Sequence, residues 1–441
     1  MVVETARRDH EEVAAEAAPA PVMTAPSPAP ADAAAPASQT RSDPGAGLPQ
    51  PQKPTPRRFR DLLALDDFER HAKRHLPRMV FGYVSGAVET GASLRAARDA
   101  FAEHRFLPRM FVDVSGRDQS VQLFGKHYAS PFGIAPLGGA AFIAYRADLQ
   151  LATAARDAQI PMILSGSSLI SLEDVHAANP DAWFQAYLAG DQPRIDRLVD
   201  RVAAAGYETL VVTGDTPLLG NREHNIRSGF SMPIKMTPNV MLQSALAPGW
   251  LLGTVFRTYW KHGAPHFENT DAERGPPMMS KLVRNTKKRD ELAWSHVEAI
   301  RRNWKGNLVV KGIMTASDAR IAKECGVDGV ILSNHGGRQL DHAVAPLDCL
   351  AEVAAEKGAM KVMIDSGLRR GTDVLKAVAL GADFVFLGRP FLYAAAIGGA
   401  DGVSHAVGIL RAEIDRDLAL VGVKRPQDLD ASYLAPARPR D

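Results

Sequence analysis

The sequence predicts an α/β protein folded as a (β/α)8 barrel, and three observations favour that fold. Short runs rich in branched apolar residues recur from residue 131 onward. Amphipathic, helix-like segments lie between these runs. Most of the runs end in polar side chains. Eight runs arranged in this way imply parallel strands that are buried on both faces.

The predicted strands cover residues 131–138, 161–166, 182–188, 209–215, 307–312, 329–335, 361–367 and 384–390. Helices are predicted between them at residues 147–159, 192–206, 317–326 and 371–381. Gly206, Gly326 and Gly381 stand where glycine caps of helix C-termini are expected. Periodicity alone also allows a doubly wound open sheet, so the choice depends on where the polar residues fall.

Polar side chains are concentrated at the carboxyl ends of the predicted strands. The members of this set are Gln185, Tyr187, Thr213, Asp215, Lys311, Ser333, His335, Asp365 and Arg389. In a barrel, the carboxyl ends of all eight strands meet at one mouth, where such barrels form their active sites. The distribution therefore favours the barrel and predicts an enzyme.

Composition narrows the class of protein. The chain has 441 residues, of which 46% are hydrophobic, and a formal net charge of +2. This charge balance argues against non-specific nucleic-acid binding, which needs a concentrated basic surface. Cys325 and Cys349 have neither metal-ligand nor CxxC spacing, so no metal site is predicted. We expect a cytoplasmic protein in a reducing compartment.

The two ends of the chain differ from its centre. Residues 1–55 are rich in Ala and Pro and nearly free of aromatic residues, which predicts a disordered tail. We find no secretory signal and no apolar run of about 18 residues, the length typical of a transmembrane helix. We expect the barrel over residues 56–430 and a C-terminal tail over residues 431–441.

One connection between predicted strands is unusually long. Residues 216–285 follow the fourth strand, and loops of this length are usually functional or disordered. The middle of this insertion, "PGWLLGTVFRTYWKHG" at residues 248–263, mixes aromatic with basic side chains. Two interpretations stay open. The insertion is either a lid or helix that packs on the barrel or on a neighbouring subunit, or a patch that binds a membrane surface.

The stretch "SNHGGRQLD", residues 333–341, places an imidazole and a guanidinium directly after a buried strand. Asp215 should reach the same rim from another strand, where its carboxylate would fix the tautomer of His335 and stabilise the protonated ring. Arg338 offers a planar fork that binds a carboxylate at two points. Each residue alone could be structural. Together they predict removal of a proton from a small carboxylic acid.

Lys311 and the last two strand ends indicate an anionic cofactor. A buried charge needs a partner, so Lys311 either pairs with Asp365 or Asp215, or faces a cofactor anion. Arg369 and Arg389 follow the seventh and eighth strands, where barrels of this kind usually bind phosphate. No GxGxxG follows the first strand, so a nicotinamide cofactor is unsupported and FMN is predicted.

The motifs resemble those of the FMN-dependent L-2-hydroxy acid oxidase and dehydrogenase family over roughly residues 60–425. "SNHGGRQLD" matches the family's active-site signature. The other matching motifs, in the family's order, are "LPRMVFGYVSGA", "IAPLG", "FQAYL", "DTPLLGNRE", "LVVKGI", "IDSGLRRGTDVLKAVALG" and "FLGRP". The resemblance implies a TIM barrel that binds FMN and oxidises an L-2-hydroxy acid to the 2-oxo acid.

The resemblance also implies roles for individual residues. His335 would be the catalytic base and Asp215 its orienting partner. Tyr187 would bind the substrate hydroxyl, and Lys311 would lie at the N1–O2 edge of the flavin. The substrate carboxylate would be held by Arg338, Arg222 and Tyr83. The residues implied in FMN binding are Ala135, Pro136, Leu137, Ser165, Gln185, Thr213, Ser333, Asp365, Ser366, Gly367, Arg369, Gly388 and Arg389, together with Lys311.

Three positions depart from the residues usual in the family. Ser366 stands where a glycine is usual, and Gly138 where some members have Ala. Ser167 replaces the bulky aromatic residue of glycolate oxidase-like members, which leaves more room over the substrate side chain. L-lactate is the favoured substrate, with a mandelate-type acid as the alternative. His335 takes a proton either from the α-carbon or from the hydroxyl during hydride transfer, and both mechanisms stay open.

The electron acceptor would be a quinone, a cytochrome or oxygen. A quinone suits the membrane interpretation of the insertion, which would place the protein on the inner face of the membrane, and oxygen suits a soluble oxidase. The resemblance alone implies a homotetramer. Two other classes of protein are kept as alternatives: a flavin-free phosphate-binding barrel isomerase or aldolase, and a non-catalytic scaffold. The intact set of His335, Asp215 and Arg338 argues against the scaffold.

Overall fold

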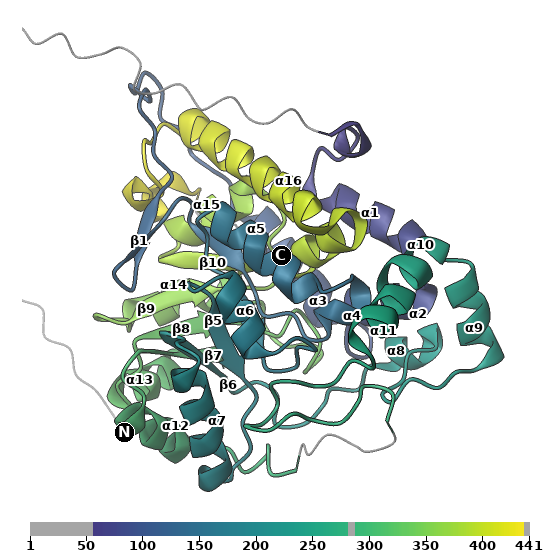
Figure 1. Ribbon diagram of the computed structural model, residues 1–441. Helices are drawn as coiled ribbons and strands as arrows, with labels where there is room; N and C mark the ends of the chain where they lie inside the picture. Colours follow the sequence, from purple (N-terminus) through teal and green to yellow (C-terminus); the bar gives the residue numbers. More distant parts are fainter. Residues whose placement is uncertain (1–55, 281–286, 436–441) are drawn as a thin grey trace, which may run out of the picture. The chain divides into compact units, whose positions relative to one another are not determined.

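The computed structural model describes residues 56–280 and 287–435. Within this part of the chain, eight parallel strands form one sheet that curves into a barrel (Figure 1). They are β3 (Phe132–Ile134), β4 (Ile163–Ser165), β5 (Trp183–Ala186), β6 (Thr209–Thr213), β7 (Asn307–Ile313), β8 (Gly329–Leu332), β9 (Lys361–Ile364) and β10 (Phe384–Leu387). Each coincides with a predicted strand, so the predicted fold class is confirmed. The disorder expected for residues 1–55 lies outside the described residues.

The order of the strands closes the sheet. Neighbouring strands follow the order β3-β10-β9-β8-β7-β6-β5-β4. A single parallel bridge between Ile134 and Met162 links β3 to the residue just before β4, and the Ile134 amide donates to the Pro161 carbonyl at 2.9 Å. The two edges of the sheet therefore meet, which excludes the doubly wound open sheet.

The interior of the barrel is filled with apolar side chains. Almost every residue of the eight strands is buried, as expected for parallel strands covered on both faces. An antiparallel hairpin of β1 (Val121–Leu123) and β2 (Lys126–Tyr128) covers the amino ends of the strands. Its Phe124 ring packs on Trp183 and its Tyr128 ring on Phe384, with centroids 5.5 and 5.9 Å apart. The hairpin leaves the opposite, carboxyl end as the open mouth.

Helices cover the outside of the barrel. They are α5 (Ala147–Asp157), α6 (Leu172–Ala178), α7 (Gln192–Ala204), α12 (Trp294–Asn303), α13 (Ala316–Glu324), α14 (Pro346–Ala355), α15 (Gly371–Ala379) and α16 (Arg389–Val421). Side-chain caps begin several of them: Asp191 accepts from the Arg194 amide and Thr315 from the Asp318 amide. Gly206, Gly326 and Gly381 follow α7, α13 and α15 with positive φ angles, as predicted.

Three helices at the N-terminal end of the described chain bring further residues to the barrel: α1 (Leu65–His75), α2 (Arg78–Ser85) and α3 (Ala92–Glu103), after the short η1 (Arg57–Phe59). α3 packs closely on the loops that follow β8 and β9. A Cβ atom on Gly367 would lie 1.9 Å from the Ala97 carbonyl oxygen, and one on Gly337 would lie 2.6 Å from the Leu94 amide. Only glycine fits at these two contacts.

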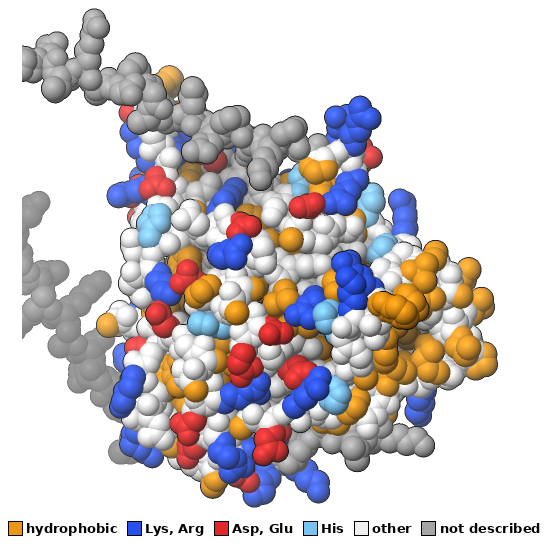
Figure 2. All heavy atoms as spheres, viewed as in Figure 1, with side chains coloured by type: hydrophobic (Ala, Val, Ile, Leu, Met, Phe, Trp, Pro, Cys, Tyr) orange, Lys and Arg blue, Asp and Glu red, His pale blue; other side chains and the backbone are white. Residues whose placement is uncertain are grey.

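The described part of the insertion contains several short helices and has two different faces. It contains α8 (Glu223–Ser228), α9 (Pro238–Ala245), α10 (Pro248–Trp250), η2 (Leu251–Phe256) and α11 (Arg257–His262). Trp250 is buried, and its Nε1 donates to the Phe142 carbonyl, so one face packs on the barrel. Figure 2 shows hydrophobic side chains gathered over α9–α11 on the other face. Among the described helices, none combines the length and the hydropathy needed to span a membrane.

The C-terminal boundary of the barrel differs from the predicted one. Residues 431–435 were expected to belong to a tail, but Tyr433 and Leu434 are buried. The Leu107 amide donates to the Tyr433 carbonyl at 2.7 Å, and the Ala435 amide to the Arg105 carbonyl at 2.8 Å. This segment contains η4 (Ala431–Tyr433) and follows η3 (Pro426–Asp428). It belongs to the folded unit because Leu434 pairs with Phe106 in an isolated antiparallel bridge.

Candidate active site

A cavity opens at the carboxyl ends of the barrel strands. Its lining includes sixteen of the residues predicted for the site: Tyr83, Ala135, Pro136, Leu137, Tyr187, Thr213, Arg222, Lys311, His335, Arg338, Asp365, Ser366, Gly367, Arg369, Gly388 and Arg389. These residues come from α2, from the loops and ends of several barrel strands, and from the insertion. The fold thus brings together side chains that are up to about 300 residues apart in the sequence.

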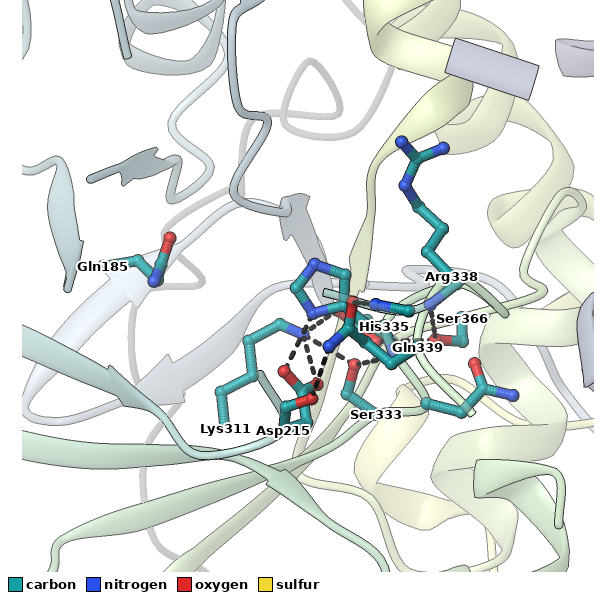
Figure 3. Close-up of polar contacts among 12 residues, drawn as sticks. Gln185, Asp215, Lys311, Ser333, His335, Arg338, Gln339 and Ser366 are labelled. Atoms are coloured by element: carbon teal, nitrogen blue, oxygen red, sulfur yellow. Dashed lines mark hydrogen bonds and ion pairs between the residues drawn. The ribbon is translucent and has the colours of Figure 1, made fainter. Parts of the chain in front are cut away.

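Four predicted residues do not line the cavity but lie beneath it: Ser165, Gln185, Asp215 and Ser333. Ser165 Oγ donates to Gln185 Oε1 at 3.2 Å. Asp215 and Ser333 contact His335 and Lys311, which do line the cavity. Figure 3 shows Asp215 and Ser333 beside Lys311, and Gln185 apart from this group. In the protein alone, Asp215 and Ser333 are connected to the cavity through His335 and Lys311.

His335 and Asp215 form the arrangement expected of a base and its orienting carboxylate. His335 Nδ1 lies 2.8 Å from Asp215 Oδ1. This bond leaves His335 Nε2 as the ring nitrogen that can take a proton. Burial opposes ionisation of Asp215, but His335 and Lys311 outweigh it and hold the pKa of this carboxyl below its ordinary value. Asp215 is therefore ionised at neutral pH and can stabilise a protonated imidazole.

Lys311 is buried at the carboxyl end of β7. Its Nζ lies 3.1 Å from Asp365 Oδ2 and 4.0 Å from Asp215 Oδ2, so both predicted ion-pair partners are in place. Burial alone would lower the pKa of Lys311, but the two carboxylates raise it above its ordinary value. The ammonium is thus charged while it faces the cavity. A fixed cation at this place can stabilise negative charge on a bound group.

Gly312 makes room for this cluster. It follows Lys311 with a φ of +106°, and the pairing of β7 with β8 shifts register between Lys311 and Ile313. A Cβ atom at position 312 would lie 2.7 Å from the Asp215 Cβ. The irregularity in β7 therefore needs glycine, and it lets Asp215 approach both His335 and Lys311.

Arginine side chains concentrate positive charge in the cavity. Arg338 Nη1 donates to the carbonyls of Tyr83 and Gly86 at 2.8 Å each, and Arg222 Nε donates to the Arg338 carbonyl at 3.1 Å. Burial, with Arg222 and Arg389 nearby, lowers the pKa of Arg338 to about 9. The protein itself destabilises this positive charge, so an anionic group such as a carboxylate would be bound favourably here.

The residues present fit FMN. Arg369 and Arg389 line the cavity near the ends of β9 and β10, and burial lowers the pKa of both guanidinium groups. Gln185 Nε2 and Thr213 Oγ1 are buried and have no hydrogen-bond partner within the described residues. Unsatisfied buried polar atoms are costly, and a flavin pyrimidine could supply the missing partners. The guanidinium groups would hold the phosphate.

Several residues at the site were not predicted from the sequence. Arg289 follows the insertion, lines the cavity and places its guanidinium carbon 5.0 Å from the centre of the Tyr187 ring. Asp341 belongs to "SNHGGRQLD" but faces away from the cavity lining and binds the start of α3. The cavity also has an apolar wall: Phe142, Leu219, Phe230, Met232, Phe267 and Met278. No motif links these apolar residues, and only the fold assembles them.

Comparisons with known proteins identify the family. The FMN-dependent dehydrogenase family matches residues 72–436. The chain is 37% identical to (S)-mandelate dehydrogenase of Pseudomonas putida over 376 residues, which are 85% of this chain and 94% of the relative. It is 36% identical to a putative L-lactate dehydrogenase of Mycobacterium tuberculosis over 87% of this chain and 91% of the relative. A crystal structure of the monotopic membrane protein (S)-mandelate dehydrogenase superposes with a TM-score of 0.77, at 36% identity, covering 85% of this chain and 99% of that one.

The family match and the cavity at the barrel mouth together place the protein among the flavin-dependent oxidoreductases of hydroxy acids. The chain belongs to the FMN-dependent dehydrogenase family. It is an FMN-dependent enzyme that oxidises 2-hydroxy acids, as the resemblance of its motifs implied. The flavin-free isomerase or aldolase and the non-catalytic scaffold are thereby set aside.

Proposed function

We propose that the enzyme oxidises an L-2-hydroxy acid whose side chain is apolar and larger than a methyl group. The observation that carries this proposal is the apolar wall of the cavity, defined above by six residues from Phe142 to Met278. Small residues line the same cavity: Gly138 and Ser167 lie side by side, and a Cβ atom on Gly138 would lie 3.2 Å from the Ser167 Cβ and 3.8 Å from the Tyr83 hydroxyl. An aromatic acid such as mandelate would bury more apolar surface there than lactate. The proposal departs from the preference for L-lactate that the motifs alone gave.

Each side chain at the cavity has its own role in the proposed reaction. Arg338 and Arg222 bind the substrate carboxylate, and the Tyr83 hydroxyl, which donates to the Gly138 carbonyl at 3.1 Å, stands beside them. Burial and the Asp215 carboxylate raise the pKa of Tyr187, so its hydroxyl stays protonated and can donate to the substrate oxygen. His335 accepts a proton at Nε2. FMN, when bound beside these side chains, would supply the acceptor for the two electrons that leave the substrate.

Anaerobic reduction of the purified holoenzyme tests the substrate. The flavin absorbance is followed after mixing with (S)-mandelate or with L-lactate at matched concentrations. We expect bleaching with both, and a kcat/KM for mandelate at least tenfold higher. Equal or higher kcat/KM for lactate would contradict the proposed preference. A protein that is not bleached by any 2-hydroxy acid would contradict the proposed base and carboxylate-binding residues.

Substitution at Ser167 tests where the side chain binds. Ser167→Phe adds a bulky ring to the lining of the cavity, next to Gly138. We expect it to lower kcat/KM for mandelate by about 100-fold, which is the order expected for a steric clash of 2–3 kcal/mol. The value for lactate should change less than threefold. Equal losses for both acids would place the side chain elsewhere.

We further propose that a membrane quinone is the electron acceptor. Exposed apolar side chains are concentrated on the insertion: Met236, Met241, Leu242, Leu246, Leu252, Phe256 and Trp260. Arg257 and Lys261 lie among them on α11. An apolar face edged by basic side chains suits the surface of an anionic membrane. The related (S)-mandelate dehydrogenase is a monotopic membrane protein, which supports the same interpretation.

Sedimentation with vesicles of phosphatidylcholine and phosphatidylglycerol tests this surface. The triple variant Leu252→Ser, Phe256→Ser and Trp260→Ser should lose vesicle binding and keep anaerobic flavin reduction. Leu420→Ser is the matched control, since Leu420 is 64% exposed on α16, outside the insertion. Reduced enzyme should stay bleached in air until a quinone is added. Rapid recovery in air would indicate an oxidase instead.

We also propose a homotetramer. Outside the insertion, one group of exposed apolar side chains is close together in the sequence: Leu107, Met110 and Phe111. An exposed apolar group of this kind is typical of a protein contact. Light scattering should give a mass about four times that of the chain, and a monomer would contradict the proposal.

A further inference from the structure

Ser366 occupies a backbone conformation that favours glycine. It follows Asp365 in the loop after β9 with a φ of +77°, in the left-handed region. Residues with a Cβ atom are disfavoured there, and they persist where other interactions hold them. The side chain of Ser366 should therefore contribute something that glycine cannot.

The Ser366 hydroxyl makes two hydrogen bonds. It accepts from the Gly336 amide at 3.1 Å and donates to Asp365 Oδ1 at 2.9 Å. Gly336 directly follows the proposed base, His335. A single hydroxyl thus connects the loop after β9 with the loop after β8. Figure 3 shows Ser366 on the same side of the site as His335 and Ser333.

These contacts belong to a closed ring of polar groups. The other carboxylate oxygen of Asp365, Oδ2, lies 3.1 Å from Lys311 Nζ. Lys311 Nζ donates to Ser333 Oγ at 2.6 Å, and Ser333 Oγ accepts from the His335 amide at 3.0 Å. The backbone between the consecutive residues His335 and Gly336 completes the ring. It joins the ends of β7, β8 and β9 without using any side-chain atom of His335.

The ring acts on the backbone of the base. His335, Gly336 and Gly337 have φ angles of +56°, +64° and +69°, so His335 is itself a non-glycine residue in the left-handed region. Two serine hydroxyls bind the amides of His335 and Gly336. Because these amides are held in place, the backbone position of His335 is fixed. The imidazole is thereby placed where its Nδ1 contacts Asp215.

We propose that Ser366 is a positioning residue that couples the Lys311–Asp365 ion pair to the backbone of His335. The base and the buried cation are thereby held as one unit, although they stand on different strands. The inference rests on the proposed role of His335. It assigns to the Ser366 side chain a task beyond the FMN binding that the motifs implied, since its two hydrogen bonds join the Gly336 amide to Asp365.

Two substitutions at Ser366 separate positioning from folding. Ser366→Gly removes the hydroxyl and suits the φ of +77°, whereas Ser366→Ala removes the hydroxyl and keeps the Cβ atom. We expect both to lower kcat about tenfold while KM changes less than twofold. The melting temperature should be unchanged or higher in Ser366→Gly and lower in Ser366→Ala. A purely structural role would make kcat follow the melting temperature.

Hydrogen exchange gives a readout independent of turnover. In the protein without FMN, the Gly336 amide should exchange at least tenfold faster in Ser366→Gly than in the wild type. Ser333→Ala should likewise expose the His335 amide, and the double variant should lose less kcat than the product of the two single losses, because both belong to one ring. Unchanged exchange at Gly336, or a kcat loss fully recovered at saturating FMN, would overturn the proposal. If the wild type oxidised no hydroxy acid, the proposed function would fail while the exchange result still tested the ring.

Discussion

We expect Asp215 to affect the reaction only through its neighbours. Its Oδ1 lies 2.8 Å from His335 Nδ1, and it does not line the cavity. Asp215→Asn keeps the size of the side chain but removes the charge that stabilises a protonated imidazole, and its amide can bind the wrong tautomer. We expect kcat to fall by about 100- to 10,000-fold, the range for a lost orienting carboxylate. Steady-state turnover and the flavin content of the purified protein measure this, and the flavin content should not change.

A distant aspartate provides the control for that substitution. Asp401 is exposed and pairs with Arg58 at 2.7 Å on the surface. Asp401→Asn should leave kcat unchanged, since exposed ion pairs contribute little. If Asp215→Asn kept kcat within threefold of the wild type, the orienting role of Asp215 would be wrong.

At the level of single residues, the sequence predicted which residues belong to the site better than it predicted where their side chains point. The stretch "SNHGGRQLD" placed His335 and Arg338 at the cavity, where the structure has them. The same stretch gave no sign that Asp341 binds residues 90–93 or that Gln339 donates to the Leu218 carbonyl. These partners are more than 100 residues away in the sequence. Only the fold decides which side chains of a motif face the ligand and which hold the loop.

Among the elements, the start of α3 depends on a carboxylate from another segment. Asp341 accepts from the Thr90 and Ser93 amides at 2.9 Å and from the Thr90 hydroxyl at 2.5 Å. Amides at a helix N-terminus have no partner within the helix, so a carboxylate there is stabilising. We expect Asp341→Ala to lower the free energy of unfolding by about 2 kcal/mol at pH 7. Urea unfolding measures the loss.

The same substitution has a defined pH dependence. Burial opposes ionisation, but the hydrogen bonds from Thr90 and Ser93 outweigh it and lower the pKa of Asp341 from 3.8 to about 2. A carboxyl with a lowered pKa stabilises the fold fully above about pH 4, and this contribution is lost as the pH falls toward 2. The difference between wild type and Asp341→Ala should therefore shrink as the pH falls from about 4 to 2. For Asp118→Ala, the control, the stability loss should be smaller, because Asp118 binds only Ser120 nearby in an exposed loop.

The barrel strands and their helices were predictable because each carries a local signal. Buried parallel strands need continuous apolar runs, and glycines such as Gly206 and Gly381 mark helix ends by their positive φ. The insertion carries no such signal. Its helices are short, and Trp250 is buried only because Phe142 and the barrel stand beneath it. Short helices that are stabilised by packing on the folded barrel cannot be predicted from the local sequence pattern alone.

For the whole molecule, the barrel gathers positive charge at one place. Arg222, Arg338, Arg369 and Arg389 all line the cavity, although the net charge of the chain is only +2. Burial lowers the pKa of Arg369 to about 10, with Arg98 and Arg389 adding to the effect. The protein without its cofactor therefore holds charges that burial and mutual repulsion destabilise. An anionic ligand that binds only the folded state should stabilise it by about 2.7 kcal/mol at 100 times its dissociation constant.

The effect of an Arg369 substitution on the melting temperature should depend on whether FMN is present. Arg369→Met removes a buried charge, so the melting temperature without FMN should be equal to or higher than that of the wild type. With FMN, the same variant should gain at least 3 °C less than the wild type, because it lacks a guanidinium that we expect to bind the phosphate. Arg411→Met is the matched control, since Arg411 is partly buried outside the cavity and donates to Ser130 Oγ and the Ala158 carbonyl. That variant should melt earlier in both conditions and keep the full gain from FMN. Equal gains in the wild type and Arg369→Met would show that Arg369 does not bind the phosphate.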